Sequence, residues 1–325
     1  MPEFSGRKIS VGIGKETTRG TAVAPSYWVK HLDIDFQNKI EKIFNESAIG
    51  VLDKYSQAEI VKEWAEGKIE GKVTDKTFGL ILASLFGAAP SSVQRGATGV
   101  YDHTYAQSQS NTGLSLTIAR KDANSDKRYA LAVLNKLDIE CVVGEFIKFT
   151  AEYVSKKGTA VANTVAFVAE NEFVPKNAVV KLATNVAGIT GASAVPVKSF
   201  KLSIERSVEP YFAFGSNDPA EIYNQEFEVK GDMVLRYTDT TYETLWSGNT
   251  NQAIDLNIIN TGVVIGTGSD NPAVRFTLPE ASISEWEVDQ AKDKIVEQTV
   301  GFQGLYNLTA AATLTAVLTN TVTSY

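Results

Sequence analysis

The chain has 325 residues, a length that favours about two domains, and 43% of them are hydrophobic, which is enough for a core in each. Its formal net charge is −7, with 31 Lys and Arg against 38 Asp and Glu. Tight binding of DNA or RNA needs a basic surplus to neutralise phosphates, so this composition argues against it. A polyanion could still pass such a surface without sticking. The single cysteine, Cys141, excludes an intrachain disulfide framework and suits a reducing compartment.

Neither end of the chain suggests export or membrane insertion. Residues 1–8 lack the apolar segment of a secretory signal. No apolar run approaches the roughly 18 residues that a membrane span requires. We therefore expect a soluble protein that is made in a cytoplasm and has no membrane partner.

Alternating apolar and polar residues predict strands with one buried face along most of the chain. The clearest examples are residues 32–36, 114–118, 198–205 and 253–258, separated by turn-forming clusters such as 215–219 and 266–272. Only two short helices are predicted, at 75–87 and 239–248, and each opens with an aspartate that is expected to cap it. The predicted fold class is mainly β.

The most informative feature is an internal repeat, because the same order of elements occurs twice. Segment 32–36 corresponds to 200–204, 68–73 to 228–234, 134–139 to 278–283, and 146–153 to 295–302. In the two helical segments, Asp75, Thr77, Phe78, Ile81 and Leu82 match Asp239, Thr241, Tyr242, Leu245 and Trp246 at identical spacing. These matches predict an N-terminal arm at 1–25, a first domain at 26–158, a linker at 159–194, a second domain at 195–308 and a C-terminal arm at 309–325.

Residues that would carry catalysis or hold a cofactor are not found. His31 and His103 lie in different segments without a cysteine or carboxylate at metal-ligand spacing. The run Gly12-Ile13-Gly14-Lys15 lacks the first glycine of a phosphate loop, and Glu16 stands where that loop needs Ser or Thr. The acidic residues are scattered along strands, as on solvated strand faces. We therefore predict no enzyme activity, no catalytic, cofactor-binding or metal-binding residues, and no cofactor.

The residues from Val11 to Pro25 contain the pattern Gly14-x-Glu16-x-x-x-Gly20-Thr21-x-x-x-Pro25. This arm resembles the opening of the tail tube (major tail) proteins of long-tailed bacteriophages (siphophages). The segment around Gly71 and Asp75, and the run 317–325, are also similar to that family. The resemblance covers most of the chain.

The resemblance implies two tandem β-sandwich-like domains, each with a short helix, whose inner strands join with those of other copies into a closed β-barrel ring. Rings would stack into a tube that forms the channel for DNA during ejection. Since most family members have one such domain and form hexamers, a duplicated chain implies a trimer with pseudo-six-fold symmetry, with a hexamer as the alternative. The implied location is the virion tail, assembled in the host cytoplasm. Implied partners are further copies of the chain, the tape-measure protein, and the tail terminator and distal tail proteins, with DNA passing through unbound.

Two sets of residues are expected to act in such a tube. Asp33 and Asp35 share one face of the first strand, as do Ser203 and Glu205 in the second copy, and these four are candidates for facing the channel. The region 37–65 is expected to form a long hairpin whose apolar tip needs a covering partner. Candidates for contacts between rings are Ile49, Val51, Leu52, Phe212 and Phe214.

Two other classes of function stay open from the residues alone. One is a two-domain bacterial surface or adhesion protein, which would normally carry an export signal. The other is an all-β hydrolase such as a glycosidase with two carboxylates.

Overall fold

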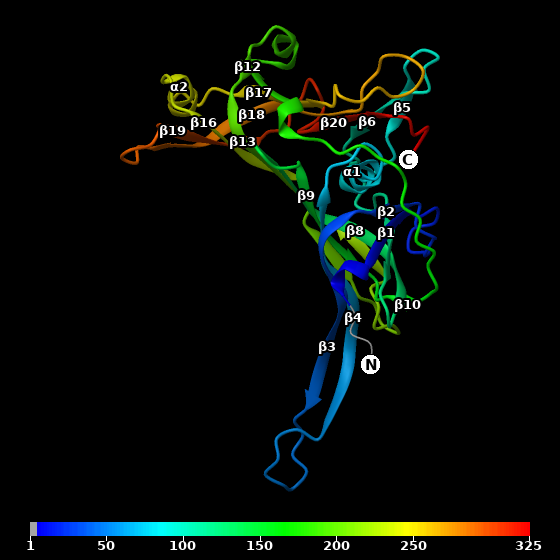
Figure 1. The fold of residues 1–325 in the computed structure, drawn as a ribbon. Coiled ribbons are helices and arrows are strands. Elements are labelled where there is room, and N and C mark those ends of the chain that lie inside the picture. Colours follow the sequence, from blue (N-terminus) through cyan, green and yellow to red (C-terminus); the bar gives the residue numbers. More distant parts are fainter. Residues whose placement is uncertain (1–4) are drawn as a thin grey trace.

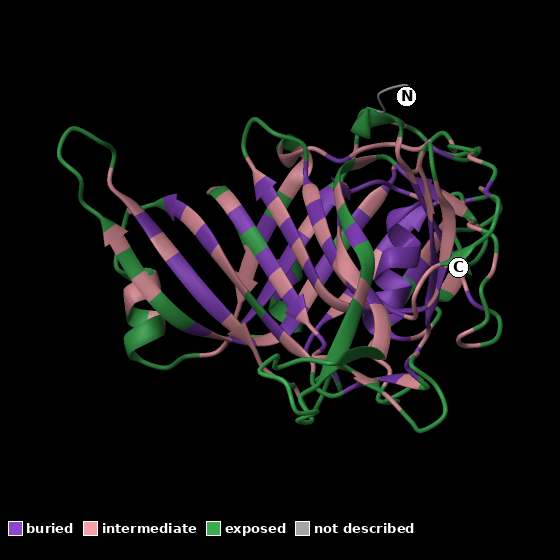
Figure 2. Ribbon diagram, turned by 90° about the horizontal axis from the view of Figure 1, so that it is seen from below, coloured by how far each residue is buried: buried purple, intermediate pink, exposed green. Residues whose placement is uncertain are grey.

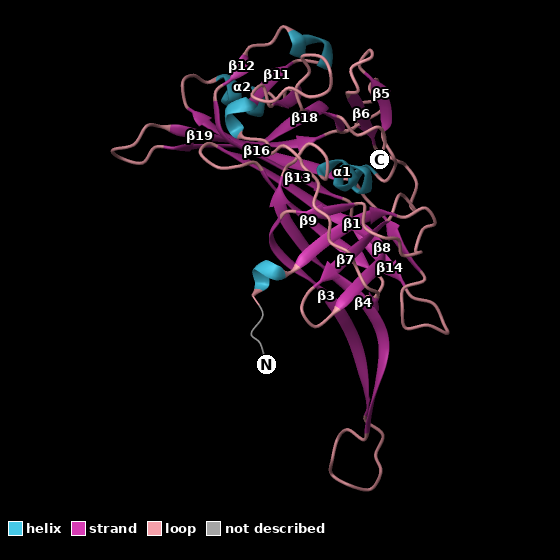
Figure 3. Ribbon diagram, turned by 45° about the vertical axis from the view of Figure 1, so that its right-hand side comes forward, coloured by secondary structure: helices cyan, strands magenta, loops and turns pink. Residues whose placement is uncertain are grey.

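The computed structural model of the protein describes residues 5–325, which form mainly antiparallel strands with two short α-helices (Figures 1 and 3). The strands fall into two units with the same order of elements. The first unit consists of β1 (Ser10–Lys15), β2 (Tyr27–Val29), β3 (His31–Asn45), β4 (Gln57–Lys72), α1 (Phe78–Phe86), β7 (Leu116–Lys121), β8 (Asp126–Val142) and β9 (Lys148–Ser155).

The second unit repeats this order. It consists of β11 (Ala178–Ala183), β12 (Ala194–Val195), β13 (Val197–Glu205), β16 (Glu228–Arg236), α2 (Thr241–Ser247), β17 (Gln252–Ile259), β18 (Ala273–Asp289) and β19 (Glu297–Gly304). The elements outside the repeat are η1 (Gly6–Lys8), β5 (Ser91–Gln94), β6 (Tyr101–Ala106), β10 (Thr159–Ala160), η2 (Pro175–Asn177), η3 (Val186–Thr190), β14 (Val208–Tyr211), β15 (Glu221–Asn224) and β20 (Thr315–Asn320).

Each unit is a sandwich of an outer and an inner sheet that share one long strand. In the first unit, residues 126–132 of β8 pair with β7 in the outer sheet, and residues 133–140 pair with β9 in the inner sheet. In the second unit, β18 is shared between β17 and β19 in the same way. The outer order is β2-β1-β7-β8 and then β12-β11-β17-β18, and the inner order is β3-β4-β9-β8 and then β13-β16-β19-β18.

The strand pairing extends the repeat beyond the boundaries expected from the sequence. The expected linker, 159–194, contains β11 and the first residue of β12, and these two strands hold the places that β1 and β2 hold in the first unit. The expected N-terminal arm likewise contains β1. These strands are short and rich in small residues, so they have little alternation for a sequence pattern to detect.

Two of the expected correspondences shift by a few residues. Asp33 pairs with Glu70, and Ser203 pairs with Lys230, the residue of β16 that is equivalent to Glu70. Asp33 is therefore equivalent to Ser203, two residues away from the expected match, and an even shift leaves each side chain on the expected face of the sheet. The last strands align through Phe149 and Phe302, which lie opposite the equivalent glycines Gly71 and Gly231. A Cβ at Gly71 would lie 2.8 Å from the Phe149 ring, and one at Gly231 would lie 2.5 Å from the Phe302 ring. Glycine is required because an aromatic ring covers the backbone at both positions.

The two helices differ in how they begin. Asp239 lies one residue before Thr240, the N-cap of α2, and accepts a hydrogen bond from the backbone N–H of Thr241, the first residue of the helix, at 2.9 Å. Asp75, which was expected to cap α1, does not cap it. Its carboxylate accepts from the backbone N and side-chain Nδ2 of Asn171, both at 2.8 Å, because residues 169–173 cross beside the start of α1. Burial raises the pKa of this carboxyl, and the bonds to Asn171 oppose that rise.

The larger of two hydrophobic clusters in residues 5–325 runs through both units, and α1 lies within it (Figure 2). Strand β20 joins the units, since it pairs with β18 of the second and with β6, an insertion of the first. The Tyr325 hydroxyl donates to the Lys76 carbonyl at 2.7 Å, beneath the start of α1. The expected C-terminal arm is therefore built into the core.

Candidate functional site

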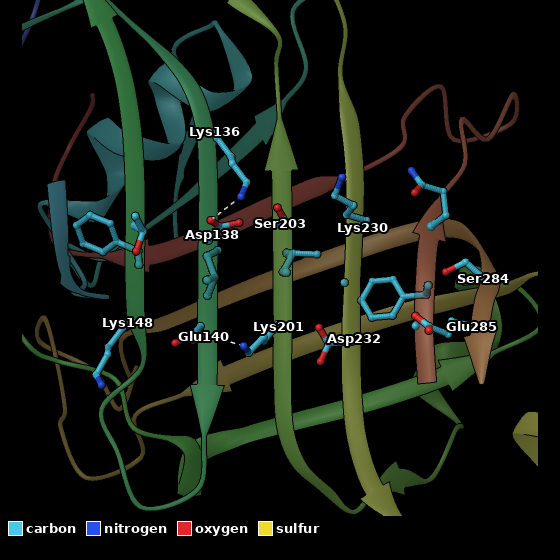
Figure 4. A pocket seen from close by; sticks show the side chains of 18 of the residues that line it. Lys136, Asp138, Glu140, Lys148, Lys201, Ser203, Lys230, Asp232, Ser284 and Glu285 are labelled. Carbon is cyan, nitrogen blue, oxygen red and sulfur yellow. Dashed lines mark ion pairs between the residues drawn. The ribbon is translucent and has the colours of Figure 1, made fainter. Parts of the chain in front are cut away.

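The inner strands of the two units form one continuous eight-stranded sheet with two different faces. Its order is β3-β4-β9-β8-β13-β16-β19-β18. Buried and less buried residues alternate along these strands, so one face packs on the core and the other is open (Figure 2). The open face contains a hollow of about 710 Å³, shown in Figure 4. We call this open side of the inner sheet the polar face.

Along each inner strand, every second side chain points to the polar face, and most of these side chains are charged or polar. Strand β8 contributes Lys136, Asp138 and Glu140, while its intervening residues Leu137 and Ile139 are buried in the core. The same alternation places acidic residues on this face more often than basic ones. The acidic side chains are Asp33, Asp35, Glu66, Glu70, Asp138, Glu140, Glu152, Glu205, Glu228, Asp232 and Glu285, and the basic ones include Lys39, Lys68, Lys72, Lys136, Lys148, Lys201 and Lys230.

Each of these lysines contacts a carboxylate. The N–O distance is 2.9 Å between Lys136 and Asp138, and also 2.9 Å between Lys201 and Glu140. Figure 4 shows both ion pairs. These contacts raise the pKa of Lys136 and of Lys201, chiefly through the hydrogen bonds to their acidic partners. The other five pairs are Lys68–Glu70 at 2.7 Å, Lys230–Glu228 at 3.2 Å, Lys72–Glu172 at 3.3 Å, Lys39–Glu66 at 3.9 Å, and Lys148–Glu145. Such exposed pairs contribute only about 0–1 kcal/mol each to stability, but they neutralise the lysines.

Several carboxylates on the polar face have no ion-pair partner among residues 5–325, namely Asp33, Asp35, Glu152, Glu205, Asp232 and Glu285. Partial burial raises the pKa of Asp232, and the nearby Lys201 lowers it. Since the lysines are neutralised and these acids are not, the polar face presents a net negative surface to anything that passes along it.

The four residues expected to face a channel all lie on the polar face. Ser203 lines the hollow, and Glu205 is close enough to raise the pKa of Lys136. Asp33 and Asp35 act in the same way on Lys68. Strand pairing makes Asp33 equivalent to Ser203, and Asp35 equivalent to Glu205. The sequence analysis predicted the central strands β8, β9 and β16 but did not name their charged residues as candidates for facing the channel, although these residues also alternate with apolar ones.

The residues expected to touch other rings lie in two places. Ile49, Val51 and Leu52 are exposed at the tip of the long β3–β4 hairpin, which projects away from the body (Figure 1). Phe214 is also exposed, in the β14–β15 loop. Phe212 instead packs inside the chain, with its ring centroid 6.3 Å from that of Trp64 on the hairpin stem.

That loop of the second unit is attached to the hairpin of the first. The Asn217 side chain donates to the Ile60 carbonyl at 3.2 Å, and the Glu63 backbone N–H donates to the Asn217 carbonyl at 2.8 Å. Lys157 also contacts Glu63 at 2.5 Å. The base of the hairpin is therefore held in place, and its tip is free to meet a partner.

Motifs from the sequence that suggested chemistry have structural roles. Glu16 of the N-terminal pattern is buried, and its carboxylate accepts bonds from Ser115 Oγ at 2.5 Å, the Gly20 backbone N at 2.7 Å and the Leu131 backbone N at 2.8 Å. Cys141 is buried, and desolvation raises the pKa of its thiol to about 11. Within residues 5–325, no group of His, Cys, Asp or Glu is arranged to hold a metal ion.

The junction between the two units is a regular pair of antiparallel strands. Strand β8 ends the inner sheet of the first unit and pairs with β13, which begins that of the second, so that Asp138 lies opposite Ser203 and Ile139 opposite Leu202. The two outer edges of the eight-stranded sheet are β3 at one end and residues 282–289 of β18 at the other. Both edges carry unpaired backbone groups, which sheet proteins normally cover.

Comparison with known proteins identifies this architecture. A family model described as "Phage tail tube protein" matches residues 6–304, which is nearly the whole chain. No curated protein matches the sequence. In the part of the chain that the structure describes, no helix is long and apolar enough to cross a membrane.

Proposed function

The chain belongs to the phage tail tube protein family and is a structural subunit of the virion tail, and on that premise we propose that three copies close into one ring around a channel. The observation that supports this is the duplicated inner sheet. One chain already contains a junction between two equivalent units, where β8 pairs with β13, and its two outer edges are the equivalents of those strands, β18 and β3.

The number of strands suits a channel for DNA. Each chain supplies an inner sheet of eight strands, so three chains would supply about 24, and barrels of 16–18 strands already enclose an aqueous pore. Closing the ring would also pair both open edges, which removes the risk of uncontrolled edge-to-edge association. Rings would then stack through surfaces that do not close on themselves, as filaments require.

In this ring the polar face would line the channel, because the opposite face packs on the core of each unit. Its lysines are held in ion pairs and its acids are in excess, so the wall would repel a DNA backbone rather than bind it. We propose a passive role, with no reaction and no cofactor. The same channel would hold the tape-measure protein during assembly, and the ends of the tube would meet the tail terminator and distal tail proteins.

Electron microscopy of the purified protein tests the proposal. We expect rings or tubes whose averaged end views have three-fold symmetry with a near six-fold outline, since the two units differ in their hairpins. Particles without a central channel, or a protein that remains monomeric at every concentration and salt condition tested, would contradict it.

A charge-reversal experiment tests which face lines the channel. Asp35→Lys together with Glu205→Lys changes equivalent positions of the two units, and should slow DNA ejection from assembled virions because the wall then attracts phosphate. The control, Ala123→Lys with Asn124→Lys, adds lysines at the exposed β7–β8 turn of the outer sheet and should leave ejection unchanged. Normal ejection from the first variant would place these residues outside the channel.

A further inference from the structure

We infer that neighbouring copies of the chain join through β18 of one and β3 of the next, in antiparallel register with Ser282 opposite Asp33. This inference rests on the proposed ring and adds the residues that meet at its joints. The chain itself supplies the template, because its β8–β13 junction joins the strands that are equivalent to β18 and β3.

The register follows from two alignments that the strand pairing fixes. Ile139 pairs with Phe149 as Ile283 pairs with Phe302, so Asp138 is equivalent to Ser282. On the other strand, Asp33 is equivalent to Ser203. Since Asp138 lies opposite Ser203 within the chain, Ser282 should lie opposite Asp33 of the next copy.

The open side of β18 is the correct one for this partner. Ala281 pairs with Gln252 of β17 on one side and with Gly304 of β19 on the other. Strand β17 begins at Gln252, so from Ser282 onward no strand within residues 5–325 pairs on the side that β17 occupies. At the internal junction β13 continues along β8 beyond the end of β7. A neighbouring β3 would continue along β18 beyond the end of β17 in the same manner.

Apolar side chains at the two open edges are exposed where their equivalents at the internal junction are covered. Leu32, the extra residue of the β3 bulge between His31 and Asp33, is 50% exposed at this edge. Ile34 is half-buried, whereas its equivalent Ile204 is fully buried. On β18 the half-buried Trp286 corresponds to the buried Cys141, so the core side of this edge also lacks a cover.

The charges at the joint also correspond. Glu140 and Lys201 form an ion pair of 2.9 Å across the internal junction. Glu285 is equivalent to Glu140, because the two residues pair with equivalent positions of β19 and β9. His31 is equivalent to Leu202, so Lys30, the residue before it, takes the place of Lys201. The signs are the same at both joints, and the register brings Glu285 of one copy to Lys30 of the next, whose Nζ lies 3.9 Å from Glu170 of its own chain.

Paired cysteines test the register in the assembled protein. Residues directly opposite on antiparallel strands have Cβ atoms about 4.5–5.5 Å apart, close enough for a disulfide or a short bismaleimide to join them. The only native cysteine, Cys141, is buried, so it gives little background. Asp33→Cys with Ser282→Cys should link chains to each other, and the ladder on a denaturing non-reducing gel should end at three chains because the ring closes.

Two controls keep the test specific. Asp138→Cys with Ser203→Cys places the same pair at the internal junction and should link within one chain, without oligomers. Asp35→Cys with Ser282→Cys is two residues out of register and should link at least tenfold less. If the first pair disturbs assembly, Lys30→Cys with Glu285→Cys probes the same register one step along.

The outcomes separate this inference from the proposed ring. Rings under the microscope with efficient linking only in the internal control, or with preferential linking of the out-of-register pair, would overturn the register while leaving the ring intact. A ladder that continues beyond three chains would contradict closure by three. The absence of rings in the unmodified protein would contradict the proposed function itself.

Discussion

The two units of the chain have the same strand order, but their helices lie in different surroundings. All nine residues of α1 are buried, and the helix contacts β1, β6 and β8. None of the seven residues of α2 is buried, and its main contact is β18. Both are labelled in Figure 1, where α1 lies inside the molecule and α2 at its end. In the first unit, other segments of the same chain cover the helix on all sides. In the second unit, the helix is partly uncovered and contacts β18, the edge strand at which the proposed ring continues.

The largest expected effect comes from placing proline at equivalent positions of an inner and an edge strand. Ser203→Pro breaks the ladder of β13 between two neighbours, and should prevent folding because proline lacks the N–H donor. Asp33→Pro alters β3, which has a neighbour on one side only, and edge strands tolerate proline. Circular dichroism and size-exclusion chromatography should find Ser203→Pro unfolded, and Asp33→Pro folded but unable to form rings.

The contrast fails if the two variants behave alike. An Asp33→Pro variant that still forms rings would show that β3 is free at its outer edge in the assembly. An unfolded Asp33→Pro variant would show that this edge is needed within the monomer.

Truncation of matched helix residues tests whether α1 and α2 differ energetically. Ile81→Ala in α1 should lower the free energy of unfolding by about 2–5 kcal/mol, because it leaves a cavity in a packed core. Leu245→Ala, at the matching position of the half-buried α2, should cost about 1 kcal/mol or less in the monomer. Urea denaturation of unassembled protein measures both, and equal losses would mean that α2 is as fully packed as α1.

A smaller effect is expected from the residue that joins the second unit to the end of α1. The Arg206 guanidinium is buried and donates to the Ser84 carbonyl at 3.0 Å and the Leu85 carbonyl at 2.8 Å. It thus satisfies carbonyls that the end of a helix leaves free, and desolvation lowers its pKa to about 10.

Arg206→Ala should therefore reduce the free energy of unfolding by roughly 1.5–3 kcal/mol, the usual range for hydrogen bonds to a charged group. The exposed Arg236→Ala is the control, with an expected change within about 0.5 kcal/mol. Denaturant titration of both variants measures the free energy of unfolding. If Arg206→Ala lowers it no more than Arg236→Ala does, the bonds from Arg206 to the end of α1 do not stabilise the fold.

The sequence predicted the fold class and the repeat because the inner strands are long and face the core on one side only. In residues 136–141 of β8 and 199–205 of β13 polar and apolar residues alternate without a break, so the two faces of these segments follow from the sequence. The same alternation put Asp35 and Glu205 on one face of the sheet. The family of the chain was visible in the N-terminal pattern, and the buried Glu16 explains why that pattern needs a carboxylate.

What the sequence did not predict depends on contacts between distant segments. The equivalence of β3 and β13 depends on how each pairs with its neighbour, and β3 pairs with β4 through a bulge between His31 and Asp33 that composition does not reveal. Asp75 has the sequence context of a helix cap, yet it binds Asn171, which lies 96 residues further along the chain. The role of β20 as a bridge also depends on β6, an insertion without a counterpart in the second unit.

That bridge carries the smallest predicted effect, a dependence of stability on pH. His103 of β6 is buried, with Nδ1 2.7 Å from Ser92 Oγ and Nε2 3.0 Å from the Asn320 side-chain oxygen on β20. The amide oxygen can only accept, so Nε2 carries the proton and the neutral ring satisfies both contacts. Desolvation lowers the pKa of His103 below its usual 6.5, although the bond to Asn320 opposes this.

Because the unfolded chain binds a proton at His103 more readily than the folded one, stability is lost as the pH falls below about 6.5, until the lowered folded pKa is reached. His103→Gln keeps a polar side chain but removes the titration, so the loss of stability between pH 7 and pH 5 should be smaller than in the unmodified chain. Thermal unfolding across this range measures the two slopes. Identical slopes would mean that the joint between β6 and β20 does not sense pH, and that the carboxylates of the chain account for its behaviour in acid.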